Sequence, residues 1–523
     1  MDQKVVDAAR AAFQGNGSGI VLGACVHDGA AHPEPVISIP LAMMNRHGLI
    51  AGATGTGKTK TLQLIAEQLS SAGVPVFLAD VKGDMSGVAV AGESSPRVTQ
   101  RATDTGYSWR ATGFPVEFLS LSGSYGAQLR ATVSSFGPLL LAKVLGLNET
   151  QSSVLSLVFK YCDDKGLLLL DLSDLRAVLQ HLTGDGAAEL AAYGGMSKQT
   201  VGVLLRELVE LEQQGADRFF GEPEFDLQDL LQVERDGRGL ISVLELKDTQ
   251  DRPALFSTFM MWMLARLYNT LPEAGDLEKP KLVFFFDEAH LLFEDASKDF
   301  KEQIERVVRL VRSKGVGVFF ITQSPKDLPA DILGQLGNRV QHALRAFTPD
   351  DEKALRAAAR TFPKTSFYDV EETLTTLGIG EALVTVLGPS GAPTSPFVSR
   401  MVPPASRMGP LTDDELKQRL AQSAQVREYA QAVDRQSARE MLAERTAARQ
   451  AAEQEAEQEA ERAQVEDAEA AAPAPARRRR AAAEPPSAFE QILKSPVTRT
   501  VVGAVTRGLM GALLGGTTRR RRR

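Results

Sequence analysis

Short, uninterrupted apolar runs alternate with helical patterns along this 523-residue chain. Such runs, bounded by glycine, proline or charged residues, are typical of buried strands in a parallel sheet. They occupy residues 48–51, 74–80, 239–245, 282–286, 316–323 and 381–387. Strands that alternate with helices predict an α/β fold with a mostly parallel sheet and helices on both faces.

Two regions flank or interrupt this alternation within the first 405 residues. Two short strands are expected at residues 19–26 and 35–39, in a segment that covers residues 1–44. We expect a mainly helical insertion at residues 135–275, because its long apolar stretches have the length of packed helices. One strand, at residues 239–245, is expected between these helices. The core domain covers residues 45–405 and ends near the Pro403-Pro404 pair.

The C-terminal part of the chain has a different composition. Residues 411–470 are rich in alanine and glutamate and predict one long helix. Its apolar positions are mostly alanine, so a weak coiled coil and a lone solvated helix remain alternatives. A proline- and arginine-rich linker at 471–487 precedes an amphipathic, glycine-containing basic tail at 488–523. This tail is compatible with docking to a partner protein, nucleic acid or an anionic membrane.

One segment carries a specific chemical signal. It matches the pattern G-x-x-x-x-G-K-[ST], in which backbone N–H groups surround the β-phosphate of a nucleotide. A strand precedes it and a helix follows it, which is the context that this phosphate-binding loop (P-loop) requires. Lys58 would reach the β- and γ-phosphates, and Thr59 would ligate Mg²⁺. The predicted nucleotide-binding residues are Gly52, Ala53, Thr54, Gly55, Thr56, Gly57, Lys58, Thr59 and Lys60.

Polar residues at the ends of other strands complete a hydrolytic site. Asp287 follows a run of five apolar residues and would hold Mg²⁺ through water, and Glu288 would activate the attacking water. Gln323 ends the strand at 316–323 and would contact the γ-phosphate or its water, because ligands bind beyond the carboxyl ends of parallel strands. For Asp80 and Asp84, three roles remain open: the Mg²⁺ water shell, a neighbouring subunit, or a solvated turn.

Several of these motifs together resemble one family. The chain contains GATGTGKT, VFLADVKGDMSG, FFFDEAH and VRSKGVGVFFITQSP in this order. This series resembles the HerA/FtsK superfamily of P-loop motors over roughly residues 40–405, and is most similar to a bacterial branch of HerA-like helicases and ATPases. The resemblance implies a RecA-like ATPase core that uses ATP and Mg²⁺. The site roles would fall to Lys58, Thr59, Asp287, Glu288 and Gln323.

The resemblance also implies assembly and a departure from the family pattern. Relatives form rings, usually hexamers, in which an arginine of the neighbouring subunit contacts the transferring phosphoryl group. Arg312 matches that arginine, and Arg46 is a second candidate. HerA-like DNA motors also carry an N-terminal β-barrel, whereas about 45 residues precede the core here, too few for a closed barrel.

Composition indicates the cellular location of the protein but not its substrate. The chain has two cysteines, no early apolar leader and no run of about 18 apolar residues, which favours a cytoplasmic protein without a membrane span. Its net charge of −7 combines −7 over residues 411–470 with +10 over residues 474–523. The remainder is acidic, so charge gives no independent support for nucleic acid.

These observations lead to one expected function and two rivals. We expect an ATP-hydrolysing ring motor that translocates duplex DNA or acts as a helicase. The first rival is an ATPase that remodels or moves protein, as in secretion or conjugation. The second is a nucleotide-gated scaffold whose basic tail recruits partners, although such a switch could dispense with Glu288.

Overall fold

A computed structural model describes residues 3–13, 18–190, 193–249, 253–275, 277–293, 298–388 and 390–470. The predicted linker at 471–487 and the basic tail at 488–523 lie outside the described residues. The chain divides into two compact units, Met1–Ala448 and Arg449–Arg523. The first unit contains the sheet and every predicted site residue.

A twelve-stranded sheet forms the centre of the first unit, in the order β2-β1-β12-β11-β10-β3-β9-β8-β4-β7-β5-β6. The eight strands from β10 to β6 run parallel to one another, and the other four continue the sheet as antiparallel strands. The bounds are β1 Gly19–His27, β2 Ala30–Pro40, β3 Gly48–Ala51, β4 Val76–Asp80, β5 Val116–Ser120, β6 Ala127–Gln128, β7 Ile241–Glu245, β8 Leu282–Phe286, β9 Val316–Thr322, β10 Asn338–His342, β11 Glu381–Thr385 and β12 Phe397–Met401.

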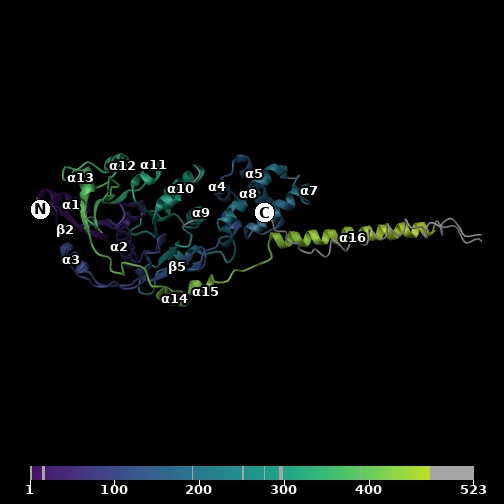
Figure 1. The fold of residues 1–523 in the computed structure, drawn as a ribbon, viewed down its shortest axis with the longest axis horizontal. Helices are drawn as coiled ribbons and strands as arrows, with labels where there is room; N and C mark the ends of the chain where they lie inside the picture. The colour runs from purple at the N-terminus through teal and green to yellow at the C-terminus, as the bar shows by residue number, and fades with distance from the viewer. Residues whose placement is uncertain are drawn as a thin grey trace, which may run out of the picture. The chain divides into compact units, whose positions relative to one another are not determined.

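Helices cover both faces of the sheet (Figure 1). Several begin at side-chain caps, such as Ser95 before α3 and Asn148 before α5. The bounds are α1 Gln3–Phe13, α2 Lys58–Ser71, α3 Pro96–Thr105, α4 Val133–Val144, α5 Glu149–Lys165, α6 Leu172–Thr183, α7 Ala187–Leu190, α8 Lys198–Gln213, α9 Pro253–Thr270, α10 Lys298–Val311, α11 Ala330–Leu333, α12 Pro349–Ala359, α13 Val370–Thr376, α14 Asp413–Gln422, α15 Ala424–Glu428 and α16 Ala438–Ala470.

Two large apolar cores lie on opposite faces because side chains alternate along each strand. On β4, Val76 and Leu78 join the core that contains the apolar residues of α1 and α2. Phe77 and Ala79 join the core formed with the helical insertion, α9 and α10. Burial on both faces explains why the central strands are continuous apolar runs. The predicted α/β class with a mostly parallel sheet is confirmed.

The ends of the first unit differ from the predicted boundaries. The predicted strands near the N-terminus exist, and β1 pairs with β12, so they extend the central sheet. The chain after residue 405 remains packed on this unit up to Ala448. Two short helices, α14 and α15, precede α16, so the long helix begins at Ala438 rather than at residue 411. Among the described residues, no helix combines the length and apolarity needed to cross a membrane.

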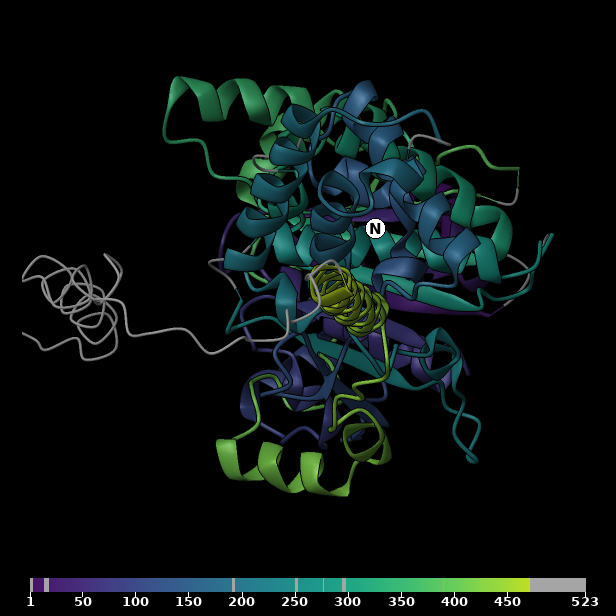
Figure 2. The ribbon, with the colours of Figure 1, turned by 90° about the vertical axis from the view of Figure 1, so that its right-hand side faces the viewer.

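The segment at residues 403–437, which we call the strap, runs from β12 past α14 and α15 to the start of α16 (Figure 1 and Figure 2). Its first residues are bound to the helix that follows the P-loop. Glu67 of α2 accepts hydrogen bonds from the backbone N–H groups of Ala405 and Ser406, at 2.7 and 3.0 Å, and from the Ser406 hydroxyl. Gln63 donates to the Ser406 hydroxyl and the Arg407 carbonyl.

We predict that Glu67→Ala destabilises the first unit. The change leaves three donors without an acceptor, two of them on the buried Ser406, and each buried loss costs about 1–3 kcal/mol before relaxation. Chemical or thermal unfolding should therefore show a loss of several kcal/mol, while the exposed Glu371→Ala variant should unfold as the wild type does. An unchanged transition for Glu67→Ala would show that α2 does not hold the strap.

Candidate nucleotide-hydrolysis site

The P-loop lies between β3 and α2, as the sequence predicts. Gly52, Gly55 and Gly57 have φ angles of 155°, 77° and 122°, which residues with a Cβ atom rarely adopt. At Gly52 a Cβ atom would also come within 2.5 Å of the Cβ atom of His342. These glycines let the backbone turn tightly between the strand and the helix.

The N-terminus of α2 presents free backbone donors to this loop. The first turn of any helix has N–H groups without intrahelical acceptors. No side chain caps α2 at Gly57, and its first turn contains no acidic residue. The helix dipole adds positive potential at the same place, so the arrangement favours a bound phosphate.

Lys58 is the first residue of α2 and is 7% exposed. Its ammonium group lies inside the loop and donates to the carbonyl oxygens of Gly52 at 2.6 Å and Ala53 at 3.2 Å. Burial lowers the pKa of Lys58, opposed by the charge of Glu288. The next two residues, Thr59 and Lys60, are only partly buried. The P-loop therefore places a cation and a threonine hydroxyl where phosphates and a metal would bind.

Asp287 directly follows β8 and is 2% exposed. Its Oδ1 atom accepts the backbone N–H of Glu288 at 3.0 Å. Its Oδ2 atom is buried and has no hydrogen-bond partner among the described residues. Burial, together with the neighbouring Glu288 charge, raises the pKa of Asp287 to about 7. An unsatisfied carboxylate oxygen at this position fits a metal-bound water.

Glu288 has a left-handed backbone with φ of 46° and is 6% exposed. This strained conformation is uncommon for a residue with a side chain and is frequent at functional sites. Its Oε1 atom accepts a hydrogen bond from the Lys82 ammonium group, and its Oε2 atom lies 3.4 Å from Nδ1 of His290. The predicted base is thus paired with a cation from the loop after β4.

Gln323 follows β9 and is exposed to a cavity of about 820 Å³ that it shares with Ala53 and His290. The turn that carries it is fixed by Asp327. Oδ2 of Asp327 accepts hydrogen bonds from the Thr322 hydroxyl and the Ser324 backbone, both at 2.8 Å. The predicted sensor residue therefore opens onto the P-loop side of the sheet.

Arg46 and Arg312 lie at the amino-terminal ends of the strands, opposite the P-loop. Arg312 precedes β9 and Arg46 precedes β3, and both line a cavity of about 680 Å³ together with Arg309 and Arg339. The seven residues of β9 separate this cavity from Gln323, a distance of roughly 23 Å. Lys58, Thr59, Asp287, Glu288 and Gln323 thus gather at one edge, and the two arginines do not join them.

The comparison with known protein families agrees with this arrangement. Residues 27–523 match the family described as "Helicase HerA-like C-terminal". The chain belongs to this HerA-like family. The match covers most of the chain, including the P-loop, the Asp287-Glu288 pair and Gln323.

Individual proteins match this HerA-like chain either over a short stretch or at low identity. It is 35% identical over 120 residues to a probable helicase of Methanocaldococcus jannaschii, which covers 23% of this chain and 22% of that protein. It is 22% identical over 347 residues to the DNA double-strand break repair helicase HerA of Saccharolobus solfataricus. That alignment covers 65% of this chain and 61% of the relative. The chain therefore spans less than two thirds of the length of these curated relatives.

Among solved structures, the bacterial conjugative coupling protein TrwBdeltaN70 matches with a TM-score of 0.49 and 15% identity. The match covers 77% of this chain and all of that one.

The HerA-like site contains residues that the motifs alone did not identify. Lys82 binds Glu288, Asp327 fixes the turn of Gln323, and His342 joins the Thr61 hydroxyl, at 2.9 Å, to the Glu381 carbonyl, at 2.8 Å. Burial lowers the pKa of His342 to about 4, so this imidazole bridges as a neutral group. Lys82 lies within the segment VFLADVKGDMSG, but its contact with Glu288 depends on the pairing of β4 with β8.

Glu245 is the most unusual of these additional groups. It ends β7 beside Asp80 of β4, is 1% exposed, and neither of its carboxylate oxygens has a hydrogen-bond partner in the described part of the chain. Burial, together with the charge of Asp80, raises the pKa of Glu245 to about 8. Burial likewise raises the pKa of Asp80 to about 6.

We predict that Glu245→Gln changes stability in a pH-dependent way. The raised pKa means that the folded state binds more protons than the unfolded state, so the wild type loses stability as pH rises from about 4.5 to about 8. The variant should match the wild type near pH 5 and melt a few degrees higher at pH 8–9. Thermal unfolding in EDTA without nucleotide measures this, and an equal offset at every pH would contradict it.

Proposed function

We propose that this HerA-like chain is an ATP-hydrolysing ring motor that translocates duplex DNA or acts as a helicase. The observation that carries the proposal is the convergence of the P-loop, Asp287, Glu288 and Gln323 at one edge of the sheet. A phosphate-binding loop beside a buried metal-binding carboxylate and a positioned base is what nucleotide hydrolysis requires.

The chemistry follows from these positions. The α2 N-terminus and Lys58 bind and orient the phosphates, and Thr59 with Asp287 would hold Mg²⁺. When bound, Mg²⁺ supplies positive charge that neutralises the phosphate oxygens. Glu288 orients a water and accepts its proton, which requires its carboxylate to leave the Lys82 ammonium group. Gln323 contacts the γ-phosphate or the attacking water from the neighbouring strand end.

The arginines at the amino-terminal ends of the strands support assembly into a homo-oligomer. Arg312 and Arg46 are about one strand length from the P-loop of their own chain and line a cavity with two further arginines. In a head-to-tail ring, that edge of one subunit would face the P-loop edge of the next. An arginine supplied in this way stabilises the charge of the transition state. We therefore assign Arg312, with Arg46 as the second candidate, to the site of the neighbouring subunit in a homo-oligomer, most simply a hexamer.

The proposed DNA substrate rests on sequence similarity to other proteins. Curated relatives are named as DNA double-strand break repair helicases, which favours DNA. A protein-remodelling ATPase of the secretion or conjugation type is the alternative, and a nucleotide-gated scaffold is the second. The setting that we propose is cytoplasmic.

We predict DNA-stimulated ATP turnover that depends on Glu288. Wild-type protein should release phosphate faster when duplex DNA is added, and Glu288→Gln should lower turnover at least about 100-fold while ATP binding persists, because only the base is lost. The matched control is Glu371→Gln, an exposed acid. Turnover that no form of DNA changes would reject the DNA motor and favour the protein-remodelling alternative.

We predict that Arg312 acts on the nucleotide of a neighbouring subunit. Arg312→Ala and Lys58→Ala should each lower turnover by about 100-fold or more. An equal, exchanged mixture of the two should regain about a quarter of the wild-type rate, because one interface in four pairs an intact P-loop with an intact arginine.

The matched control for this experiment is Arg306→Ala, an exposed arginine on helix α10, which ends one residue before Arg312. It should turn over ATP as the wild type does. A mixture that stays as inactive as its parents, although the two variants co-assemble, would contradict a role for Arg312 across the interface.

A further inference from the structure

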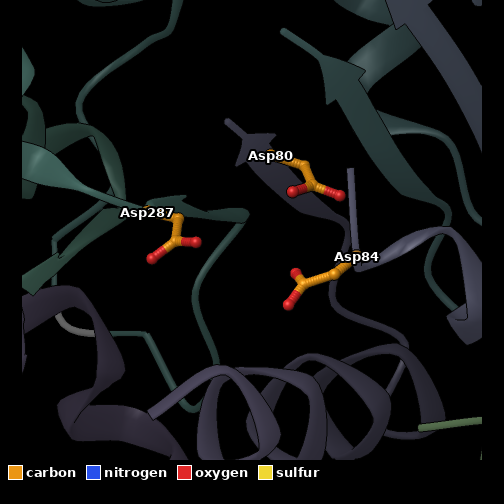
Figure 3. A group of neighbouring side chains, drawn as sticks. All are labelled: Asp80, Asp84 and Asp287. Atoms are coloured by element: carbon orange, nitrogen blue, oxygen red, sulfur yellow. The ribbon is translucent and has the colours of Figure 1, made fainter. Parts of the chain in front are cut away.

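Three aspartates converge beside the proposed nucleotide site (Figure 3). Asp80 is the last residue of β4, Asp84 lies in the following loop, and Asp287 follows β8. One carboxylate oxygen from each lies within 4.8 Å of the others. Asp80 is 0% and Asp287 2% exposed, so two of the three carboxylates are fully enclosed. Figure 3 shows their carboxylate groups facing a common space.

The strand register extends this acidic group by one residue. Ala79 pairs with Phe286 and Asp80 pairs with Glu245, so Asp287, Asp80 and Glu245 stand on three neighbouring strands in one row. All three share the face that α2 covers, at the strand spacing of about 4.8 Å. A Cβ atom at Gly83 would lie 3.4 Å from Oε2 of Glu245, so this side chain reaches beneath the loop that carries Asp84.

The oxygens of this row are incompletely satisfied. Both oxygens of Glu245, Oδ2 of Asp287 and Oδ1 of Asp84 are buried without a hydrogen-bond partner within the described ranges. A buried carboxylate without a partner is costly, and native proteins rarely contain several together. The unpaired carboxylate of Glu245 supports a cation site independently of the proposed hydrolysis, because Glu245 lies two strands away from Asp287 and has no role in that reaction.

Lys82 and Lys60, two lysines near the row, make no hydrogen bond to these oxygens. The Lys82 ammonium group binds Glu288, and that of Lys60 donates to Oε1 of Gln63 at 3.4 Å. Asp80 accepts the backbone N–H groups of Gly83 and Met85, both at 2.8 Å, and so fixes the loop that presents Asp84. Each carboxylate oxygen of Asp80 still has a second lone pair for a ligand.

We propose that Asp80, Asp84 and Asp287 bind a divalent cation in the absence of nucleotide, with Glu245 beside it as an outer acceptor for its water. Three carboxylates form an all-oxygen set that suits Mg²⁺, Mn²⁺ or Ca²⁺. Binding of this cation requires neither Thr59 nor nucleotide phosphates, although Asp287 would also contact the nucleotide-bound metal. Its purpose, to hold a metal ion at the site before ATP arrives, rests on the proposed ATPase, whereas its binding does not.

The test is a titration of the nucleotide-free full chain with Mn²⁺ alone, followed by electron paramagnetic resonance of free Mn²⁺. Wild-type protein should bind one Mn²⁺ per chain. Asp84→Asn should weaken binding at least tenfold, and Glu245→Gln a few fold. Asp84 is the informative position because it is partly exposed and its side chain makes no hydrogen bond that the fold requires, whereas Asp80 fixes its loop.

Two controls separate this cation from others. Thr59→Ala should leave nucleotide-free Mn²⁺ binding unchanged, because Thr59 ligates only the nucleotide-bound metal. Asp104→Asn, in helix α3, should also bind Mn²⁺ as the wild type does. Unchanged thermal unfolding of Asp84→Asn in EDTA would confirm that its loss of Mn²⁺ is local.

The outcomes distinguish this inference from the proposed function. An absence of Mn²⁺ binding without nucleotide, or binding that Asp84→Asn leaves unchanged, overturns the inference even if ATP is hydrolysed. Binding that Asp84→Asn weakens, in a protein that never hydrolyses ATP, supports the inference and rejects the ATPase.

Discussion

The parallel pairing of β3, β9, β8, β4 and β7 is the constraint on which the rest of this structure depends. Parallel strands end at the same edge, so residues far apart in the sequence become neighbours there. Lys58, Asp80, Glu245, Asp287 and Gln323 each follow or end one of these strands. Each strand is buried on both faces, so a slip of one residue would exchange the two apolar cores and turn every one of these side chains to the wrong face.

This concentration of polar groups has an electrostatic consequence. Three carboxylates from three neighbouring strands, those of Asp287, Asp80 and Glu245, lie where water is largely excluded, and burial raises their pKa values. Lysines provide partial compensation, since Lys82 binds Glu288 and Lys58 binds the loop carbonyl groups. In the proposed function, a bound cation would offset this negative charge, and bound phosphates would add to it.

The sequence predicted much of this site because its signals are local. A P-loop can be identified from eight residues, and the strand ends with Asp287 and Gln323 follow from apolar runs. The partners could not be predicted in this way. Lys82 and Glu288 are distant in sequence, and the isolation of Glu245 depends on β7 lying between β4 and β5. The core was expected to end near residue 405 because of the Pro403-Pro404 pair, whereas the strap continues along it through hydrogen bonds to Glu67 and Gln63.

The two edges of the sheet explain why the proposed function needs more than one subunit. Phosphate-binding groups gather at the carboxyl ends of the strands, and Arg46 and Arg312 lie at the amino ends. A strand of seven residues is too rigid and too long for Arg312 to reach the P-loop of its own chain. In the proposed ring, each interface joins one edge of each kind, so a complete site exists only between subunits. Hydrolysis at one interface would then change the contacts that hold two neighbours together, which provides a physical route from chemistry to movement.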